Sequence, residues 1–426
     1  MNTDDSLIDV QCVTGEIFKL SSNSLKRHSI YLFNRIECFP HLQNCTIRLK
    51  LSYLTTARIV EFMTNGDPFL TSIDNAMEVY VVSKEFEIPE LFKQCRNFLV
   101  TLMTDTNVCR IHDFACEQSD TILQYYCWKM FDSHWETILN GEDFLHCKDQ
   151  TIERFVSRPI YPENLTEFVL FSAIYNWAKL RVRDKEESNE NLDDFTIGET
   201  CRAILNPYLS RIRFLVMDYD NLEYIFQQLH VLKPNEFNAI RDYPINEDLS
   251  NFPTISEKTA NRLQESYTDE NFNNPLFIYK NRRNLGSTRI GQLLMRKFFA
   301  CHVVVTEDCF IESLQLPITH CNVEGILVNI QGIVGINSTL VNLESLTCRT
   351  DGLIILQEPI FLERNSNAYL EASIPIEELT IENSVLSSCN ADSYINDLYL
   401  SELSLFGKGR NTEDWDIFYF DVNLYF

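Results

Sequence analysis

Hydrophobic and polar residues near the start of the chain follow first a period of two and then a helical period. Apolar side chains alternate with polar ones on either side of the turn residues Thr14-Gly15-Glu16, which predicts a β-hairpin over residues 7–20. Over residues 22–36 the apolar side chains recur at the spacing of one helix face. The first hundred residues therefore predict a mixed α+β module. After the first helix, a short strand is expected at 46–49 and further helices at 54–65, 73–86 and 89–103.

The middle of the chain, from residue 107 to residue 243, has apolar residues at helical spacing throughout. The highly charged stretch 181–194 breaks this spacing and is expected to be a surface loop. A polar and acidic stretch at 246–274 follows, and its composition is typical of a linker. The helices are expected to form a rigid spacer between the first module and the C-terminal region.

From Lys297 onward the period changes to two, and β-branched and aromatic residues become frequent. Many short apolar segments separated by turn residues predict an antiparallel β-sandwich. The segments expected to be strands are 301–305, 309–316, 325–330, 339–346, 352–356, 359–362, 369–374, 399–406 and 417–426.

Charge and cysteine usage narrow the classes of partner. The chain has 36 Lys+Arg against 61 Asp+Glu, a net charge of −25, which repels nucleic acid and anionic lipid. Arg282, Arg283, Arg289, Arg296 and Lys297 cluster loosely, and a solvated face or interdomain contact is favoured over a nucleic-acid patch. The 14 cysteines form no C-x-x-C pair, and neither a signal peptide nor an apolar membrane span is evident. A cytoplasmic or nuclear protein with reduced thiols is expected, with no nucleic-acid or membrane partner.

The candidate catalytic and metal-binding motifs are weak. Cys38, His41 and Cys45 have a spacing compatible with zinc ligands, but a structural zinc site needs four ligands and no further ligand pair lies nearby. His146 and Cys147 are adjacent, and adjacent side chains diverge on a helix, which disfavours a nucleophile–base pair. No phosphate-binding, metalloprotease or nucleophile-elbow motif occurs. We therefore expect no enzymatic activity, no metal and no cofactor.

The first hundred residues resemble a BTB/POZ domain. Phe62-Met63-Thr64-Asn65-Gly66 is similar to the family's aromatic-rich helix end before Thr-Gly, and the spacing of Phe86, Ile88, Leu91 and Cys95 is similar to that of its closing helices. The order of the predicted hairpin, helices and strand agrees with this fold. The remaining matching positions are Asp9-Val10, Phe18, Leu25 and Ser29.

The BTB resemblance implies dimerisation and a cullin partner. BTB domains pair through their N-terminal segment and first helix, which makes Leu7, Leu25 and Leu32 the candidate dimer residues. Cullin-binding relatives usually carry a hydrophobic-x-Glu motif before the strand predicted at 46–49. This chain has Phe39-Pro40-His41 and Leu42-Gln43-Asn44, both without the acid, and Ser21-Ser22 replaces the usual His-Lys/Arg pair. Phe39, Leu42 and Asn44 are the candidate cullin-binding residues.

Two further resemblances divide the rest of the chain. Residues 107–243 resemble a BACK domain, through Asn107-Val108-Cys109 and through Leu170-Phe171 with Ala173-Ile174 and Trp177. The C-terminal region resembles a divergent PHR domain, through Asp351-Gly352 and Glu358-Pro359-Ile360, although the glycines of its Phe310–Leu316 motif are missing. The expected division is a BTB/POZ domain at 1–105, a BACK domain at 106–244, a linker at 245–296 and a PHR-like sandwich at 297–426.

These resemblances imply a protein-interaction adaptor. The first hypothesis is a substrate-recognition subunit of a cullin-RING ubiquitin ligase, with a homodimer partner, a cullin scaffold and an unknown protein substrate. The alternative is a non-catalytic BTB scaffold, or a nuclear regulatory protein, that has lost cullin binding. The missing acid at Asn44 and the Ser21-Ser22 pair motivate the alternative.

Overall fold

The computed structural model describes residues 6–39, 44–162, 164–185, 193–246, 263–264, 277–279, 298–316, 324–374, 418–419 and 421–425. The chain divides into two compact units, each of which is discontinuous in sequence. Unit 1 comprises Met1–Arg154, Phe168–Tyr208 and Asp220–Phe237, and unit 2 comprises Phe155–Glu167, Leu209–Tyr219 and Asn238–Phe426. The predicted BTB and BACK regions therefore share one compact unit along most of their length.

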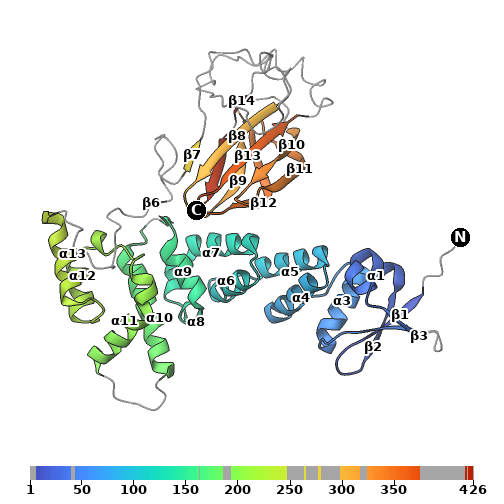
Figure 1. Ribbon diagram of the computed structural model, residues 1–426, viewed down its shortest axis with the longest axis horizontal. Helices are drawn as coiled ribbons and strands as arrows, with labels where there is room; N and C mark the ends of the chain where they lie inside the picture. The colour runs from blue at the N-terminus through green and yellow to red at the C-terminus, as the bar shows by residue number, and fades with distance from the viewer. Residues whose placement is uncertain are drawn as a thin grey trace. The chain divides into compact units, whose positions relative to one another are not determined.

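Unit 1 begins with a four-stranded sheet in the order β2-β1-β4-β3 (Figure 1). The hairpin at its start is confirmed, with Ile8 opposite Leu20 in antiparallel register. The central pair β1–β4 is parallel, because two helices lie between these strands in the chain. The elements are β1 (Leu7–Gln11), β2 (Ile17–Ser21), α1 (Ser22–His28), α2 (Ile30–Phe33), β3 (Glu37–Phe39) and β4 (Asn44–Arg48).

The helix predicted over residues 22–36 is divided at Ser29, so this prediction is wrong in its length. Ser29 has extended backbone angles of φ −149° and ψ 102°, and its hydroxyl accepts a hydrogen bond from the backbone N–H of Leu32. The same hydroxyl donates to the Phe86 carbonyl at 2.6 Å. Serine commonly caps helices in this way, so Ser29 ends α1 and begins α2.

Three helices complete the N-terminal module, and their starts have simple local causes. Ser52 and Ser72 cap α3 and α4 by accepting hydrogen bonds from Thr55 N–H and Asn75 N–H. Pro89 occupies the first position of α5, as expected. The helices are α3 (Tyr53–Asn65), α4 (Ile73–Glu85) and α5 (Pro89–Thr101), in agreement with the predicted elements to within a few residues.

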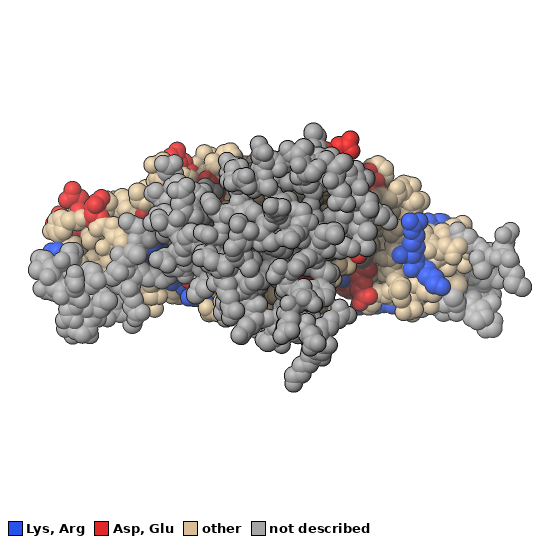
Figure 2. Space-filling model, turned by 90° about the horizontal axis from the view of Figure 1, so that it is seen from above, with Lys and Arg blue, Asp and Glu red and all other residues tan. Residues whose placement is uncertain are grey.

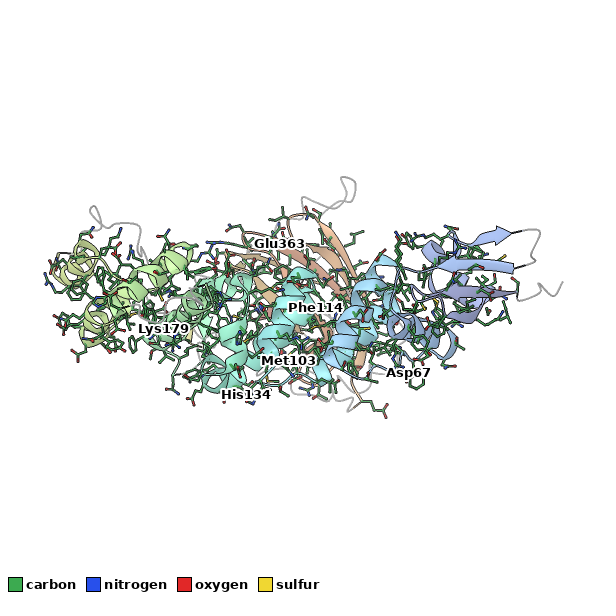
Figure 3. The ribbon with its side chains drawn as sticks, turned by 90° about the horizontal axis from the view of Figure 1, so that it is seen from below. Asp67, Met103, Phe114, His134, Lys179 and Glu363 are labelled. Carbon is green, nitrogen blue, oxygen red and sulfur yellow. The ribbon has the colours of Figure 1, made fainter. Side chains whose placement is uncertain are left out.

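The middle of the chain is helical, as predicted. His134 has non-helical angles and kinks α7 (Figure 3). Residues 181–185 of the stretch expected to be a loop extend α10, and residues 186–192 lie outside the described residues. The helices are α6 (Val108–Glu117), α7 (Thr121–Leu139), α8 (Glu142–His146), α9 (Asp149–Ser157), α10 (Glu167–Lys185), α11 (Asp194–Leu209), a 3-10 turn at Phe214–Val216, α12 (Tyr219–Gln227) and α13 (Pro234–Asn246).

Unit 2 contains a large, mainly antiparallel sheet in the order β14-β8-β13-β10-β11-β12-β9-β15, with β7 on β8. We predicted an antiparallel β-sandwich; apart from β7, the strands of this sheet follow one hydrogen-bonded path. Strands β11 and β12 pair at one position in the register, Cys348 opposite Ile354. The strands are β7 (Phe277–Tyr279), β8 (Phe298–Val305), β9 (Cys309–Gln315), β10 (Ile326–Val334), β11 (Thr339–Cys348), β12 (Leu353–Leu362), β13 (Asn367–Ser373), β14 (Phe418–Tyr419) and β15 (Asp421–Tyr425).

Alternate side chains of these strands form one buried core. On β13, Ala368, Leu370 and Ala372 are buried while the residues between them are partly exposed. We expected two strands at 352–356 and 359–362, but β12 is continuous, and a register shift between Ile355 and Ile360 absorbs the irregularity. The strand predicted at 399–406 lies outside the described residues. Most of the linker predicted at 245–296 does so too, although the short strand β6 (Leu263–Gln264) pairs with β5 (Ile160–Tyr161).

Candidate interaction surfaces

The three candidate dimer residues lie in different environments. Leu7 is 61% exposed at the start of β1, where its side chain is available to a partner. Leu25 and Leu32 are 1% and 2% exposed, and they belong to the core of the chain itself. Ile30, which lies between them in sequence and is 66% exposed, has the outward position that we assigned to these two leucines. Leu7 and Ile30 are therefore the better candidates for a dimer contact near α1 and α2.

A second exposed apolar group lies at the turn end of the hairpin. Val13, Ile17 and Tyr53 are each more than half exposed. The Val13 N–H donates to the Leu51 carbonyl at 3.0 Å, and the rings of Phe18 and Tyr53 lie 5.3 Å apart, so the turn and the start of α3 meet. Sequence reasoning missed this group because a period of two shows which residues share a face but does not show which face is buried.

The candidate cullin-binding residues lie in the β3–β4 hairpin, which the sequence did not predict. Phe39 ends β3 and lies opposite Asn44, the first residue of β4, in antiparallel register. Leu42 lies between them, outside the described residues. Two of the three candidates therefore occupy paired positions on the two strands.

Cys45 is disulfide-bonded, and Cys38 is its partner in the β3–β4 register. This differs from the reduced thiols that we predicted, and a disulfide-bonded Cys45 has no thiolate to offer a zinc ion. Ten other described cysteines are free. Within the described residues no three His, Cys, Asp or Glu side chains are grouped so that they could hold a metal ion.

A buried ion pair joins the N-terminal module to the helices that follow it. Asp120 caps α7 by accepting from the Leu123 N–H, while its other oxygen accepts from Tyr80 on α4 at 2.6 Å and from the Arg96 Nε on α5 at 2.8 Å. All three polar side chains of this triad are less than 10% exposed. Burial, followed by the nearby Asp120 carboxylate, raises the pKa of Tyr80, which stays protonated as a donor. Met103 and Phe114 mark this passage from α5 to α6 (Figure 3).

A second buried network holds α6 against the start of α9. Asp113 accepts hydrogen bonds from the Lys148 N–H and from the Thr151 hydroxyl, and the ring of His112 lies 2.7 Å from the same hydroxyl. His112 is fully buried, so this Asp–Thr–His arrangement cannot meet a substrate. We interpret it as a structural link between α6 and the start of α9.

His146 and Cys147 behave as the sequence suggested. His146 is exposed, whereas Cys147 is 2% exposed and burial raises the pKa of its thiol. The Cys147 carbonyl instead accepts from the Trp177 indole N–H at 2.9 Å. The guanidinium of Arg181 lies 3.7 Å from the centre of the Trp177 ring. Trp177 is thus a core residue that connects α10 to the turn before α9.

A shallow concavity of about 380 Å³ lies beside α8, lined by Asp105, Thr106, Thr137, Gly141, Glu142, Asp143 and His146. Burial raises the pKa of Asp143, and its carboxylate accepts the Cys109 N–H at 2.7 Å. This carboxylate is therefore used to cap α6, and the remaining acids are open to solvent. Among the described residues, the side chains that line the concavity form no group that could hold a metal ion.

The charge is distributed unevenly along the chain. Residues 6–103 contain ten Asp+Glu and ten Lys+Arg, whereas residues 298–374 contain nine Asp+Glu and only Arg349 and Arg364. Lys and Arg side chains gather over the N-terminal module in the view of Figure 2. The two regions therefore present different fields to a charged partner.

The curated proteins that this chain matches are BTB/POZ domain-containing proteins, so the matched part of the chain is similar to that class of protein. BTB/POZ domain-containing protein 3 of Homo sapiens is 29% identical over 168 residues, which are 39% of this chain and 30% of that protein. BTB/POZ domain-containing protein 6 of Homo sapiens is 31% identical over 106 residues, 25% of this chain and 19% of that protein. The chain spans less than a third of the length of the curated relatives it matches.

The resemblance to BTB/POZ proteins is therefore confirmed, and the relatives support a role as a protein-interaction adaptor. No family model matches the chain. The BACK and PHR-like assignments stay predictions. Among the helices that the structure describes, none combines the length and the apolar character needed to cross a membrane.

Proposed function

We propose that this chain is a substrate-recognition adaptor of a cullin-RING ubiquitin ligase that dimerises through its BTB module. The observation that carries the proposal is the similarity to BTB/POZ proteins. Ubiquitin transfer would take place on other subunits, so the chain needs surfaces and no catalytic group, metal or cofactor of its own. A dimer would present two copies of the substrate-binding region and raise the effective concentration for a bivalent partner. The proposal places this assembly in the cytoplasm or nucleus.

The proposal assigns each contact to a different part of the chain. The β3–β4 hairpin would supply the cullin contact through Phe39 and Leu42, and Leu7 with Ile30 would supply the dimer contact. The triad of Tyr80, Arg96 and Asp120 supports a fixed orientation of the first helices after the BTB module, because it links α4 and α5 to α7 inside one unit. The sheet of unit 2 would hold the substrate.

The cullin contact is tested by pull-down of the full chain with a purified cullin N-terminal region. Phe39→Ala with Leu42→Ala should reduce binding about thirtyfold, because truncating a buried aromatic at an interface costs about 2 kcal/mol or more. Val81→Ala is the control, since Val81 is a 40% exposed aliphatic residue on α4, outside the hairpin. Asn44→Glu should strengthen binding by restoring the missing acid. If wild type and Asn44→Glu both fail to bind, the cullin assignment is refuted.

Dimerisation is tested by light scattering of the full chain, which should give twice the mass of one 49.8 kDa chain. Leu7→Asp with Ile30→Asp should give the monomer mass, because each buries a charge in the proposed contact. Val81→Asp is the matched control and should stay dimeric. A wild-type monomer at micromolar concentration would contradict the proposal.

The second candidate function is a BTB scaffold or nuclear regulatory protein that dimerises but binds no cullin. The absence of an acid from both Phe39-Pro40-His41 and Leu42-Gln43-Asn44 favours it. The two functions differ in one result, because the scaffold would dimerise in light scattering and recover no cullin in the pull-down.

A further inference from the structure

The outer face of unit 2 carries a row of partly apolar side chains across four neighbouring strands. Cα pairing places His302 of β8 beside Tyr369 of β13, Tyr369 beside Ile333 of β10, and Ile333 beside Leu340 of β11. These strands lie side by side in Figure 1. Leu340 is 79% exposed, and Ile336 in the adjoining turn is 64% exposed. The row is therefore continuous in register and open to solvent at its β11 end.

A polar and acidic row lies next to it on the same face. This row lies two residues from the first on each strand. Glu371 of β13 pairs with Gln331 of β10, and Gln331 pairs with Asn342 of β11. Glu371 accepts hydrogen bonds from Tyr369 at 2.9 Å and from Gln331 at 3.4 Å, and Glu344 accepts from Asn342 at 3.2 Å. Among the described residues no lysine or arginine pairs with Glu344 or Glu371.

The charge of the surrounding region points to a cationic occupant. Residues 298–374 contain nine acids and two arginines, and one of these, Arg364, already pairs with Glu307 at 3.5 Å. An acidic partner would be repelled by this field, whereas a basic partner would be attracted before contact. Exposed leucine and isoleucine side chains beside the carboxylates add an apolar contact that a free cation could not use.

We propose that this outer face, defined by His302, Tyr369, Ile333, Leu340, Glu344 and Glu371, binds a basic protein segment that carries apolar side chains between its cations. The apolar row receives the apolar side chains, and Glu344 and Glu371 receive the cations. The inference rests on the proposed function and refines it, because it names the face and the chemical class of the recruited protein.

The test uses the full chain and a short fluorescent peptide of alternating Lys and Leu, with an alternating Glu and Leu peptide as the control. Fluorescence anisotropy should show binding of the basic peptide that weakens with salt, and no binding of the acidic one. Leu340→Ser should weaken binding on the order of tenfold, from the loss of one buried aliphatic side chain. Glu344→Gln with Glu371→Gln should weaken binding and flatten its salt dependence.

Matched controls separate this face from the rest of the acidic surface. Ile355→Ser alters a 57% exposed isoleucine on β12, and Glu363→Gln alters an exposed acid after β12; both should bind the peptide as wild type does. All substituted residues are at least partly exposed, so the unfolding temperature of each variant should equal that of wild type. A lowered unfolding temperature would reveal a folding defect. If Ile355→Ser weakens binding as much as Leu340→Ser does, or if the acidic peptide binds equally well, the proposal is overturned.

A basic segment of the chain itself is a second candidate occupant, which the test must separate from a partner. Residues 280–297 contain six Lys+Arg and no acid. If Arg282→Ala with Arg283→Ala and Arg289→Ala strengthens peptide binding tenfold, the face belongs to this segment and the partner assignment is overturned. The cullin pull-down distinguishes failure of the proposed function from failure of this inference. Leu340→Ser should weaken peptide binding and leave cullin binding unchanged. Peptide binding itself requires no cullin.

Discussion

The triad of Tyr80, Arg96 and Asp120 gives the most direct test of how the BTB module is joined to the helices after it. Asp120→Ala removes the acceptor of both Tyr80 and Arg96 and also the N-cap of α7. The Arg96 side chain is 9% exposed in its salt bridge with Asp120, so the variant leaves a buried cation without this partner. Breaking a buried ion pair from one side costs about 3–5 kcal/mol, a large fraction of the stability of an ordinary domain.

The measurement is denaturant unfolding of the full chain followed by helical circular dichroism. Tyr80→Phe is the matched variant, because it removes one hydrogen bond and leaves the ion pair and the cap, and it should cost about 1 kcal/mol. Arg96→Met with Asp120→Ala should recover part of the loss, since the buried cation that had lost the Asp120 carboxylate is then gone. If the free energy of unfolding of Asp120→Ala lies within about 1 kcal/mol of that of wild type, the ion pair contributes far less than a buried pair should.

Two further predictions concern the sheet of unit 2 and the cap of α6. Gly332→Ala should destabilise unit 2 by about 1–3 kcal/mol or more in thermal unfolding, because a Cβ on β10 would overlap the Tyr369 carbonyl and the Leu370 backbone. Substitution of the exposed Gln331 by Ala is the control, and equal stability of the two variants would contradict the β10–β13 register. Burial raises the pKa of Asp143, so its proton stabilises the folded state at low pH and this contribution is lost as pH rises through the raised pKa. The stability of wild type relative to Asp143→Asn should therefore increase as pH falls from about 7 to about 4, and a pH-independent difference would refute the burial argument.

Local patterns predicted most elements of the N-terminal module. The turn at Thr14-Gly15-Glu16 joins two short strands, and Pro89 begins a helix for the reason that its sequence position suggests. The alternating segments 301–305 and 309–316 also form strands close to their expected bounds. These features depend on residues that are near one another in the chain, so no knowledge of tertiary contacts was needed.

The features that sequence reasoning missed depend on distant residues. Ser29 divides its helix because the hydroxyl also reaches the carbonyl of Phe86, which lies 57 residues away. Leu25 and Leu32 share a helical face, but only the packing decides that this face is internal. Asp120 appears in the sequence as an ordinary helix cap, and nothing local shows that its second oxygen receives Tyr80 and Arg96. The candidate dimer site was therefore only partly predictable.

The uneven charge distribution bears on where two copies of the chain could meet. A two-fold dimer brings the same surface of each copy together, so any net charge on that surface is opposed by an equal charge of the same sign. Residues 298–374, with nine acids and two arginines, would repel a second copy of themselves, whereas residues 6–103 balance ten acids with ten bases. The physical expectation is that self-association uses the N-terminal module, and that the acidic sheet stays separate and available to a cationic partner. The same contrast makes the two contacts separable by salt, because screening weakens the attraction of a basic partner far more than it weakens an apolar contact between neutral surfaces.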